Sequence, residues 1–370
     1  MPETGEAAVF WGVGKPFELR EFPVPDPAPG AIVIKVALAN ICGSDLHYWR
    51  GDMDVVAMGR PLPLVLGHEA TGRVHKLGAG VTTDSTGQPL REGDRVVYKY
   101  MNPCGHCPAC LRRQYKSCPR RLSNWWVSCE EWPHFQGAFG QYYYLRPNHA
   151  VFKVPDELSD EMVAGVNCAL TQVVAGFEIA GLRAGETVVI QGAGGLGVYA
   201  AAVAKEAGAH RVVVIDGVDE RLALARAFGA DHLVDLREYP EAADRIKVVQ
   251  QLCDDWGGDV VVELVGNPAV MDEGIRMTAP EGRYLEIGNI NVGWKGSIDP
   301  SLLVFGNRKI VGVSHYEGEH LKRALDFMLR TRDRYPYDRV LSHKFPLAQI
   351  NEACEQQDKG YITRSAVVPN

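Results

Sequence analysis

The sequence lacks a long unbroken hydrophobic run, an excess of basic residues, and a basic leader followed by an apolar stretch. Its most apolar stretch, residues 187–204, is interrupted by Gln191 and four glycines, so it does not predict a transmembrane helix. The 39 lysines and arginines are outnumbered by 46 acidic residues, giving a net charge of -7. This balance argues against a general nucleic-acid or anionic-membrane surface. We therefore expect a cytoplasmic protein with neither nucleic-acid nor membrane partners.

The length of 370 residues predicts two domains. Residues 30–155 are rich in glycine and proline and have short apolar runs, which predicts a β-rich domain with irregular loops. From about residue 160 onwards, helical stretches alternate with apolar strands, which predicts βαβ units, a parallel sheet and an α/β fold class. The expected elements include a helix at 160–180, strands at 187–191, 212–216, 260–265 and 283–287, and helices at 196–208 and 220–228.

A glycine-rich turn, GAGGLG, follows the first of these strands and opens a helix. Its glycines permit a tight turn and a close approach of a pyrophosphate to the helix N-terminus. Asp216 ends the next strand, where a carboxylate binds ribose hydroxyls and repels a 2′-phosphate, which favours NAD over NADP. Arg221 either accommodates a 2′-phosphate or is a solvated helix residue. The expected cofactor-binding residues of the turn are Gly192, Gly194, Gly195, Leu196 and Gly197.

Nine cysteines are spread unevenly along the chain, and in a cytoplasmic protein they are expected to be thiols or metal ligands. Four of them have the spacing of a closed tetrahedral zinc site, which stabilises the fold and leaves no position for a substrate. An iron–sulfur cluster is the alternative, but the last gap of the bacterial ferredoxin motif is three residues and not seven. The predicted ligands of this structural Zn²⁺ are Cys104, Cys107, Cys110 and Cys118.

A second metal site is indicated by Cys42, in CGSDLH, and His68, in GHE. Each residue alone means little, but a catalytic zinc needs three protein ligands and one open position beside a nicotinamide site. Cys168 is a plausible third ligand, and Glu69 is the alternative. Asp45 and Glu69 are both suited to orient the ligands as neighbouring carboxylates.

Together these motifs resemble the zinc-dependent medium-chain alcohol dehydrogenase superfamily, because CGSDLH, GHE, GDRV, the four-cysteine segment, GAGGLG and Asp216 occur in that order. The resemblance covers nearly the whole chain. It implies a GroES-like β-rich catalytic domain and a Rossmann domain, with the active site between them. The implied boundaries are 1–165 for the catalytic domain, with its zinc lobe at about 100–120, 166–315 for the NAD-binding domain, and 316–370 for a segment that returns to the catalytic domain.

The resemblance also implies residue roles. Ser44 matches the hydroxyl that hydrogen-bonds the substrate oxygen, His47 matches the distal histidine of a proton relay, and Glu69 matches the acidic neighbour of the zinc. Arg221 matches a basic residue beside the adenosine ribose. Arg364, in GYITRS, resembles a C-terminal arginine that touches the pyrophosphate.

Some features depart from the family pattern. Thr171 lies three residues after Cys168, where relatives often have a threonine four residues after, and this leaves Cys168 and Glu69 both open as the third ligand.

Tyr100 matches a position that lines the substrate pocket. The segment 120–137 is unusually aromatic; it either walls a substrate pocket or covers the catalytic domain or a subunit contact. Its aromatic residues include Trp125, Trp126, Trp132 and Phe135.

The implied reaction is reversible hydride transfer between an alcohol and NAD, with one catalytic and one structural Zn²⁺. The alcohol proton leaves through Ser44 to His47, whose ordinary pKa near 6.5 suits that role. The substrate is a small-molecule alcohol or carbonyl compound: a secondary alcohol, a polyol or a larger pathway alcohol. The alternatives are a non-catalytic dinucleotide-binding protein of the same fold and an NADP-preferring carbonyl reductase. By family resemblance we expect a homodimer or homotetramer.

Overall fold

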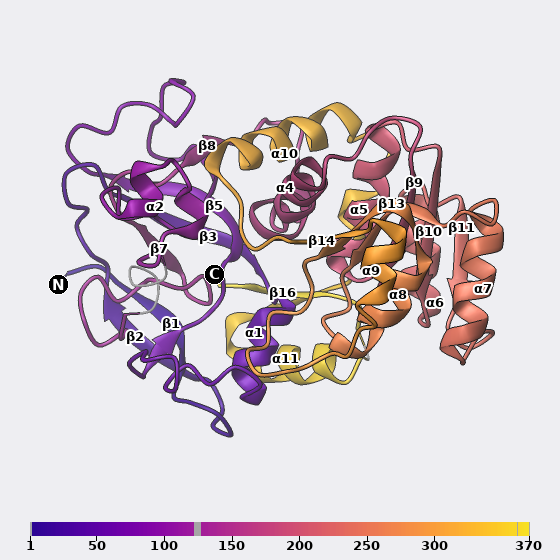
Figure 1. Ribbon diagram of the computed structural model, residues 1–370. Helices are drawn as coiled ribbons and strands as arrows, with labels where there is room; N and C mark the ends of the chain where they lie inside the picture. Colours follow the sequence, from indigo (N-terminus) through magenta and orange to yellow (C-terminus); the bar gives the residue numbers. More distant parts are fainter. Residues whose placement is uncertain (1, 122–126, 361, 370) are drawn as a thin grey trace. The chain divides into compact units, whose positions relative to one another are not determined.

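The computed structural model describes residues 2–121, 127–360 and 362–369. The chain forms two compact units, which we call unit 1 and unit 2. Unit 1 comprises Met1–Cys168, Glu317–Arg332 and Tyr337–Asn370, and unit 2 comprises Ala169–Tyr316 and Asp333–Pro336. Unit 1 thus combines the N-terminal part with two later segments, whereas unit 2 is built mainly from the middle of the chain (Figure 1).

Unit 1 contains two β-sheets. The smaller sheet has the order β2–β1–β4, and its strands are antiparallel. The larger sheet follows β15–β16–β3–β5–β6–β8, with β7 paired to β3. The strands are β1 (Thr4–Phe10), β2 (Glu18–Pro23), β3 (Ile32–Asn40), β4 (Leu64–Val65), β5 (Glu69–Leu77), β6 (Arg95–Tyr98), β7 (Tyr142–Leu145), β8 (Val151–Lys153), β15 (His343–Pro346) and β16 (Ser365–Val368).

Strand β3 organises the larger sheet, because it pairs with β5, β7 and β16. At its carboxyl end, Asn40 lies opposite Glu69, the first residue of β5, and opposite Ala366 in β16. The next residue, Ile41, donates its N–H to the carbonyl of Ser365 over 2.9 Å. Three segments that are far apart in the sequence therefore meet at the end of β3, directly before Cys42.

Helices surround these sheets in unit 1. The longest, α10 (Gly318–Thr331), buries residues at spacings of three and four, including Leu321, Ala324 and Met328, as expected of an amphipathic helix. The others are short. They are α1 (Gly43–Arg50), α2 (Pro108–Leu111), α3 (Asp160–Val163), α11 (Ile350–Asp358) and the 3₁₀ turns η1 (Tyr115–Ser117), η4 (Tyr337–Arg339) and η5 (Leu347–Gln349).

The helix expected at 160–180 is not continuous. Helix α3 and helix α4 (Thr171–Ala180) are separated by a π-helical segment, η2 (Val166–Leu170). A π turn redirects side chains and often occurs at functional sites, which the apolar pattern does not reveal. By length and composition Asp160–Ala180 could cross a membrane, but 67% of its apolar window is buried inside the protein, so this is weak evidence for a span.

Unit 2 contains a six-stranded parallel sheet with the order β11–β10–β9–β12–β13–β14. The central strands carry runs of buried valine and isoleucine, such as TVVIQ and RVVVID, because a parallel sheet is covered on both faces. The expected α/β fold class is thereby confirmed. The strands are β9 (Thr187–Gln191), β10 (Arg211–Asp216), β11 (His232–Asp235), β12 (Gly258–Glu263), β13 (Thr278–Glu286) and β14 (Lys309–Gly312).

Helices cover both faces of this sheet (Figure 1). Helices α4, α5 (Gly195–Glu206) and α6 (Asp219–Ala227) pack together on one face. Helices α7 (Ala242–Leu252), α8 (Met271–Met277) and α9 (Ser301–Gly306) pack on the other, with the 3₁₀ turn η3 (Pro268–Val270) leading into α8. Because the strands of this sheet are parallel, their carboxyl ends lie at the same edge, where the loops after β9, β10 and β11 are available to a ligand.

Candidate active site

The first candidate ligand, Cys42, is the N-cap residue of α1. Its backbone N–H donates to Asp45 Oδ2 over 2.9 Å, and the N–H of Asp45 donates back to the carbonyl of Cys42 over 3.0 Å. This reciprocal cap fixes the turn between β3 and α1. It also places the sulfur at the positive end of the helix, where a thiolate is favoured.

Four potential donors lie together in unit 1: Cys42, His68, Glu69 and Cys168. One ligand atom from each lies within 4.8 Å of all the others. Cys42, His68 and Glu69 are at most 7% exposed. The structure therefore brings together every residue that the sequence offered for the second metal site, including both alternatives for the third ligand.

Cys168 reaches this cluster from the π-helical segment η2. Its neighbour Asn167 is fully buried and donates through Nδ2 to the carbonyl of His68 over 3.0 Å and to that of Tyr98 over 3.1 Å. Asn167 thereby ties η2 to the ends of two strands. Sequence reasoning missed this residue, although an asparagine within an apolar helical stretch was an available signal.

The four donors shift one another's protonation. A hydrogen bond from the Cys168 thiol holds the pKa of Cys42 well below its usual range, against the opposing effect of burial. Burial would lower the pKa of His68, but the charges of Asp45 and Cys42 raise it well above its usual range. His68 Nδ1 lies 3.4 Å from Asp45 Oδ1. Asp45 therefore contacts two candidate ligands, the backbone of Cys42 and the ring of His68, as a ligand-orienting carboxylate does.

Glu69 is fully buried and paired with Arg364. Burial raises the pKa of Glu69 to about 7, although the Arg364 guanidinium opposes that rise. Asn40 Nδ2 also donates to Glu69 Oε2 over 3.5 Å. The structure thus locates Arg364, which is 6% exposed, at the metal cluster of unit 1 through Glu69.

Two further predicted residues lie on α1. Ser44 and His47 are both half-buried and are separated by three positions, so they share one face of the helix. Tyr100, expected to line a substrate pocket, has its ring centroid 4.7 Å from that of His68. The structure thus places Tyr100 against a candidate ligand, and Ser44 and His47 on the helix that Cys42 caps.

The four cysteines of the second group form a separate cluster, and their sulfurs also lie within 4.8 Å of one another. Cys107 Sγ is 3.5 Å from Cys110 Sγ and 3.8 Å from Cys118 Sγ. A tetrahedral site with Zn–S bonds of about 2.3 Å places its sulfurs about 3.8 Å apart. The backbone N–H groups of Cys104 and Cys110 donate to sulfurs over 3.4 and 3.5 Å, as neighbours of a thiolate site do.

The aromatic segment at 120–137 is only partly described. Trp125 and Trp126 lie outside the described residues. Trp132 is 52% exposed and packs edge-on against Tyr144, with centroids 5.0 Å apart. Phe135 is fully buried, so it belongs to the core of unit 1.

The glycine-rich turn of unit 2 fits a dinucleotide. Gly192 has φ +94°, and at Gly197 a Cβ atom would lie 1.9 Å from the carbonyl oxygen of Gly192. At Gly194, the residue that precedes α5, a Cβ atom would meet nothing within 4 Å. The turn thus needs glycine for its shape at two positions and leaves open space at the third. Gly195 and Leu196 form the first turn of α5.

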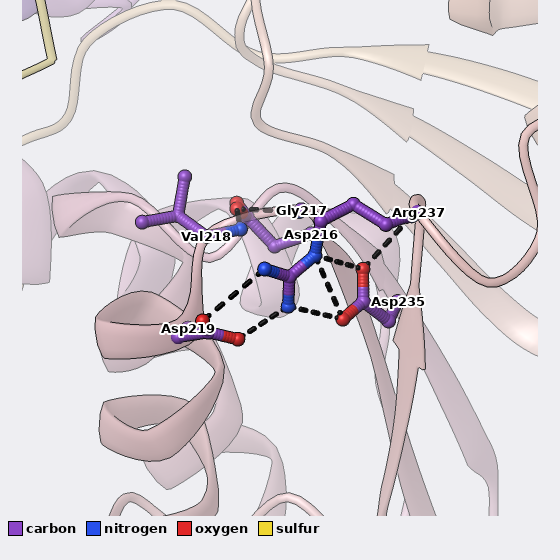
Figure 2. A network of polar contacts seen from close by, with 6 residues as sticks. All are labelled: Asp216, Gly217, Val218, Asp219, Asp235 and Arg237. Carbon is purple, nitrogen blue, oxygen red and sulfur yellow. Dashed lines mark hydrogen bonds and ion pairs between the residues drawn. The ribbon is translucent and has the colours of Figure 1, made fainter.

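Asp216 joins this turn to the next strand. Its Oδ2 accepts the N–H of Ala193 over 2.7 Å, and its Oδ1 accepts those of Gly217 and Val218 over 2.8 and 3.0 Å. Figure 2 shows the same strand ends, where Arg237 pairs with two further carboxylates, Asp219 and Asp235. Arg221 lies in the first turn of α6. Three carboxylates therefore lie at the strand ends that would hold an adenosine ribose, and the charge of Arg237 is balanced by two of them.

The donor chemistry fits the groups that the sequence predicted. Two cysteines with an imidazole are a usual donor set for Zn²⁺ with one open position, and four cysteines are a usual closed set. The glycine turn at a helix N-terminus, followed by a carboxylate at the end of the next strand, is a usual dinucleotide site.

Comparison with known families gives matches over most of the chain. Residues 28–156 match the family described as alcohol dehydrogenase GroES-like domain. Residues 195–330 match the family described as zinc-binding dehydrogenase.

Individual relatives agree. The chain is 33% identical over 352 residues to 5-exo-hydroxycamphor dehydrogenase of Pseudomonas putida, covering 95% of each chain. It is 32% identical to sorbitol dehydrogenase of Bacillus subtilis, covering 78% of this chain and 76% of that one, and 32% identical to L-threonine 3-dehydrogenase of Pyrococcus abyssi, covering 89% and 88%. Among solved structures, an alcohol dehydrogenase of Thermotoga maritima superimposes with a TM-score of 0.91 at 28% identity, covering 100% of both chains.

Proposed function

Because the chain belongs to the zinc-dependent medium-chain dehydrogenase superfamily, we propose that it transfers hydride reversibly between an alcohol and NAD at a zinc held by Cys42, His68 and Cys168. It is an oxidoreductase that acts on CH–OH groups of small molecules and uses zinc and a nicotinamide dinucleotide. The observation that carries the proposal is the four-donor cluster within 4.8 Å, assembled from three separate segments of unit 1. The four-cysteine cluster holds a second, structural zinc.

The choice of Cys168 over Glu69 as third ligand is supported by their partners. Glu69 is already paired with Arg364, and moving it onto a metal would disrupt this buried ion pair. Cys168 is hydrogen-bonded to Cys42 through its thiol, so its sulfur faces the other donors. Glu69 and Arg364 then act as a buried pair beside the ligands.

When bound, zinc supplies a Lewis acid for the alcohol oxygen, and the nicotinamide accepts the hydride. The chain's own residues supply the proton path. The Ser44 hydroxyl accepts the proton of the substrate alcohol while giving its own proton onwards. His47, one helical turn away on α1, receives that proton.

NAD is preferred over NADP in this proposal. Three carboxylates, those of Asp216, Asp219 and Asp235, lie at the ends of β10 and β11 and the start of α6, and they would repel a 2′-phosphate. Arg237 is committed to two of them. Arg221 stays the residue most able to oppose this preference.

The substrate is a secondary alcohol, a polyol or a larger pathway alcohol. The relatives named for hydroxycamphor, sorbitol and threonine support this range. We also propose a cytoplasmic homodimer or homotetramer. Strand β14 is at the edge of its sheet, and the neighbouring Val304 and Phe305 are 72% and 88% exposed, as edges that pair between subunits often are.

The direct test is to follow formation of the reduced nicotinamide, NADH from NAD or NADPH from NADP, over a panel of alcohols and polyols. We expect NAD-linked turnover that chelation abolishes. Ser44→Ala should lower turnover while NAD binding, measured by fluorescence, is unchanged. A Ser44→Ala variant with weakened NAD binding and normal turnover would contradict the relay, and silence across the panel would contradict the proposed reaction.

A further inference from the structure

The end of helix α1 is folded back so that Asp52 contacts His47. Gly51 closes the helix with φ +88°, and its N–H is bonded to the carbonyls of His47 and Tyr48. This positive φ favours glycine, and a Cβ atom at Gly51 would also lie 2.8 Å from Cγ1 of the exposed Val13. The turn brings Asp52 Oδ2 to 2.8 Å from His47 Nδ1.

Arg50 holds the Asp52 carboxylate in place. Its Nε and Nη2 lie 2.9 and 2.7 Å from Asp52 Oδ2, and its Nη1 is paired with Asp358, the last residue of α11. His47, Asp52 and Asp358 have side chains that are 18%, 24% and 24% exposed. We call these four residues, His47, Arg50, Asp52 and Asp358, the His47 cluster.

Two groups compete for the same ring nitrogen. Arg50 Nη2 lies 2.9 Å from His47 Nδ1, and as a donor it would need Nδ1 to carry the lone pair. Asp52, an acceptor, needs Nδ1 to carry the proton. Arg50 Nη2 is closer to Asp52, at 2.7 Å, and a guanidinium bonds more strongly to a carboxylate than to a neutral imidazole. The geometry therefore favours Nδ1–H donating to Asp52, which leaves the lone pair on Nε2.

The Asp52 carboxylate is the charged acceptor of the His47 ring. Hydrogen bonds from His47 and Arg50 hold the pKa of Asp52 below its usual range in spite of burial, so the carboxylate is ionised at neutral pH. Within the His47 cluster, Arg50 from the same helix and Asp52 from the following turn contact His47, and Asp358 of α11 contacts Arg50.

We propose that Asp52, held by Arg50, which is itself paired with Asp358, is the positioning residue that keeps the proton-accepting nitrogen of His47 at Nε2. This rests on the proposed function for the role of His47 as the end of the proton path. The proton lost by the alcohol passes to Ser44 as Ser44 gives its own to His47 Nε2, and the imidazolium then releases one proton to water.

The test compares kcat of the Asp52→Asn variant with that of the wild-type enzyme over pH 5 to 9. The plateau should fall by about 10- to 100-fold, because an amide does not specify the tautomer. Asp52→Glu should recover part of the plateau. Asp326→Asn, an exposed change on α10 that removes a partner of Lys322, is the matched charge control and should leave the profile unchanged.

A second readout does not need activity. In ¹⁵N-histidine spectra assigned with His47→Asn, the neutral ring of the wild type should be the tautomer with its lone pair on Nε2, and Asp52→Asn should lose that preference. A kcat plateau and a tautomer that both stay unchanged in Asp52→Asn would overturn the proposal. If the wild type has no dehydrogenase activity but the spectra behave as expected, the proposed function fails and the Asp52–His47 pair stands; if His47→Asn retains full turnover, the relay fails.

Discussion

The two cysteine-containing clusters of unit 1 each bring four donor atoms within 4.8 Å of one another, but they are built from different parts of the chain. The four-cysteine cluster is supplied by fifteen consecutive positions, 104–118, whereas the Cys42 cluster takes its donors from three distant segments. The first can form as a local loop around a metal. The second exists only when β3, β5 and η2 are folded against one another.

The groups that surround the two clusters also differ: backbone groups of the same loop in one, and side chains from several segments in the other. The four-cysteine cluster is contacted by backbone N–H groups of its own loop. The Cys42 cluster is bordered by ionisable and polar side chains: Asp45, Arg364 and Asn167. A site that only stabilises the fold needs its sulfurs satisfied, whereas a site that performs chemistry needs its ligands tuned. The comparison predicts that damage to one cluster affects stability and damage to the other affects activity.

The largest expected effect is from Cys42→Ser. Loss of a Lewis acid worth several kcal/mol predicts a fall in kcat/KM of about 10³-fold, while the melting temperature changes little. Zinc content measured by atomic absorption should fall from two to one per chain. An active Cys42→Ser enzyme that retains one zinc would show that the wrong cluster had been assigned to catalysis.

The second effect is from Cys118→Ser. Cys118 is fully buried, and loss of a structural metal is among the few changes that cost roughly 4–5 kcal/mol. The melting temperature should therefore fall by roughly 10 °C. The soluble variant, assayed below that temperature, should keep most of its turnover. If Cys118→Ser is stable but inactive, the contrast between the clusters is lost.

The sequence predicted those features that residue type and spacing determine. The strands at 187–191 and 212–216 follow from runs of β-branched residues between glycines, and the parallel sheet follows from their alternation with helices. The candidate donors Cys42, His68, Glu69 and Cys168 were identified from short motifs. The structure adds that all four converge.

What the sequence could not supply depends on tertiary contacts. The π-helical segment interrupts an apolar stretch that the sequence predicts as one helix. The extra residue of a π turn does not change the hydrophobic pattern enough to be recognised. Asn167 bonds to carbonyls 69 and 99 residues away. The pairing of Arg50 with Asp358 joins residues separated by 308 positions. No local pattern encodes such pairs.

Thiol chemistry of the metal-free protein gives a third test. A hydrogen bond from the backbone of His106 lowers the pKa of Cys104 to about 6, whereas burial raises that of Cys129 to about 11. Since the thiolate is the nucleophile, alkylation of Cys104 should accelerate as pH rises towards 6 and level off above 7. Cys129 should stay unmodified at pH 8. Peptide mass spectrometry distinguishes the two, and equal labelling would contradict the assigned environments.

The smallest expected effect lies outside both clusters, in unit 2, and concerns cofactor choice. Asp216→Asn removes the charge nearest the glycine turn, so binding of 2′,5′-ADP should improve relative to AMP by roughly tenfold, as expected for like charges at a partly exposed site. Both zincs and the melting temperature should be unaffected. Calorimetric titration measures the ratio without requiring turnover.

Asp219→Asn is the matched variant, because it frees Arg237 from one carboxylate but leaves Asp216 in place. If Arg237 is restrained only by its partners, this change should also favour 2′,5′-ADP, by a smaller factor because Asp219 is exposed and its charge is screened. Arg237→Gln should abolish that gain in the Asp219→Asn background. If instead Asp219→Asn has no effect while Asp216→Asn does, the preference for NAD rests on the buried carboxylate alone, and the network of Figure 2 is structural.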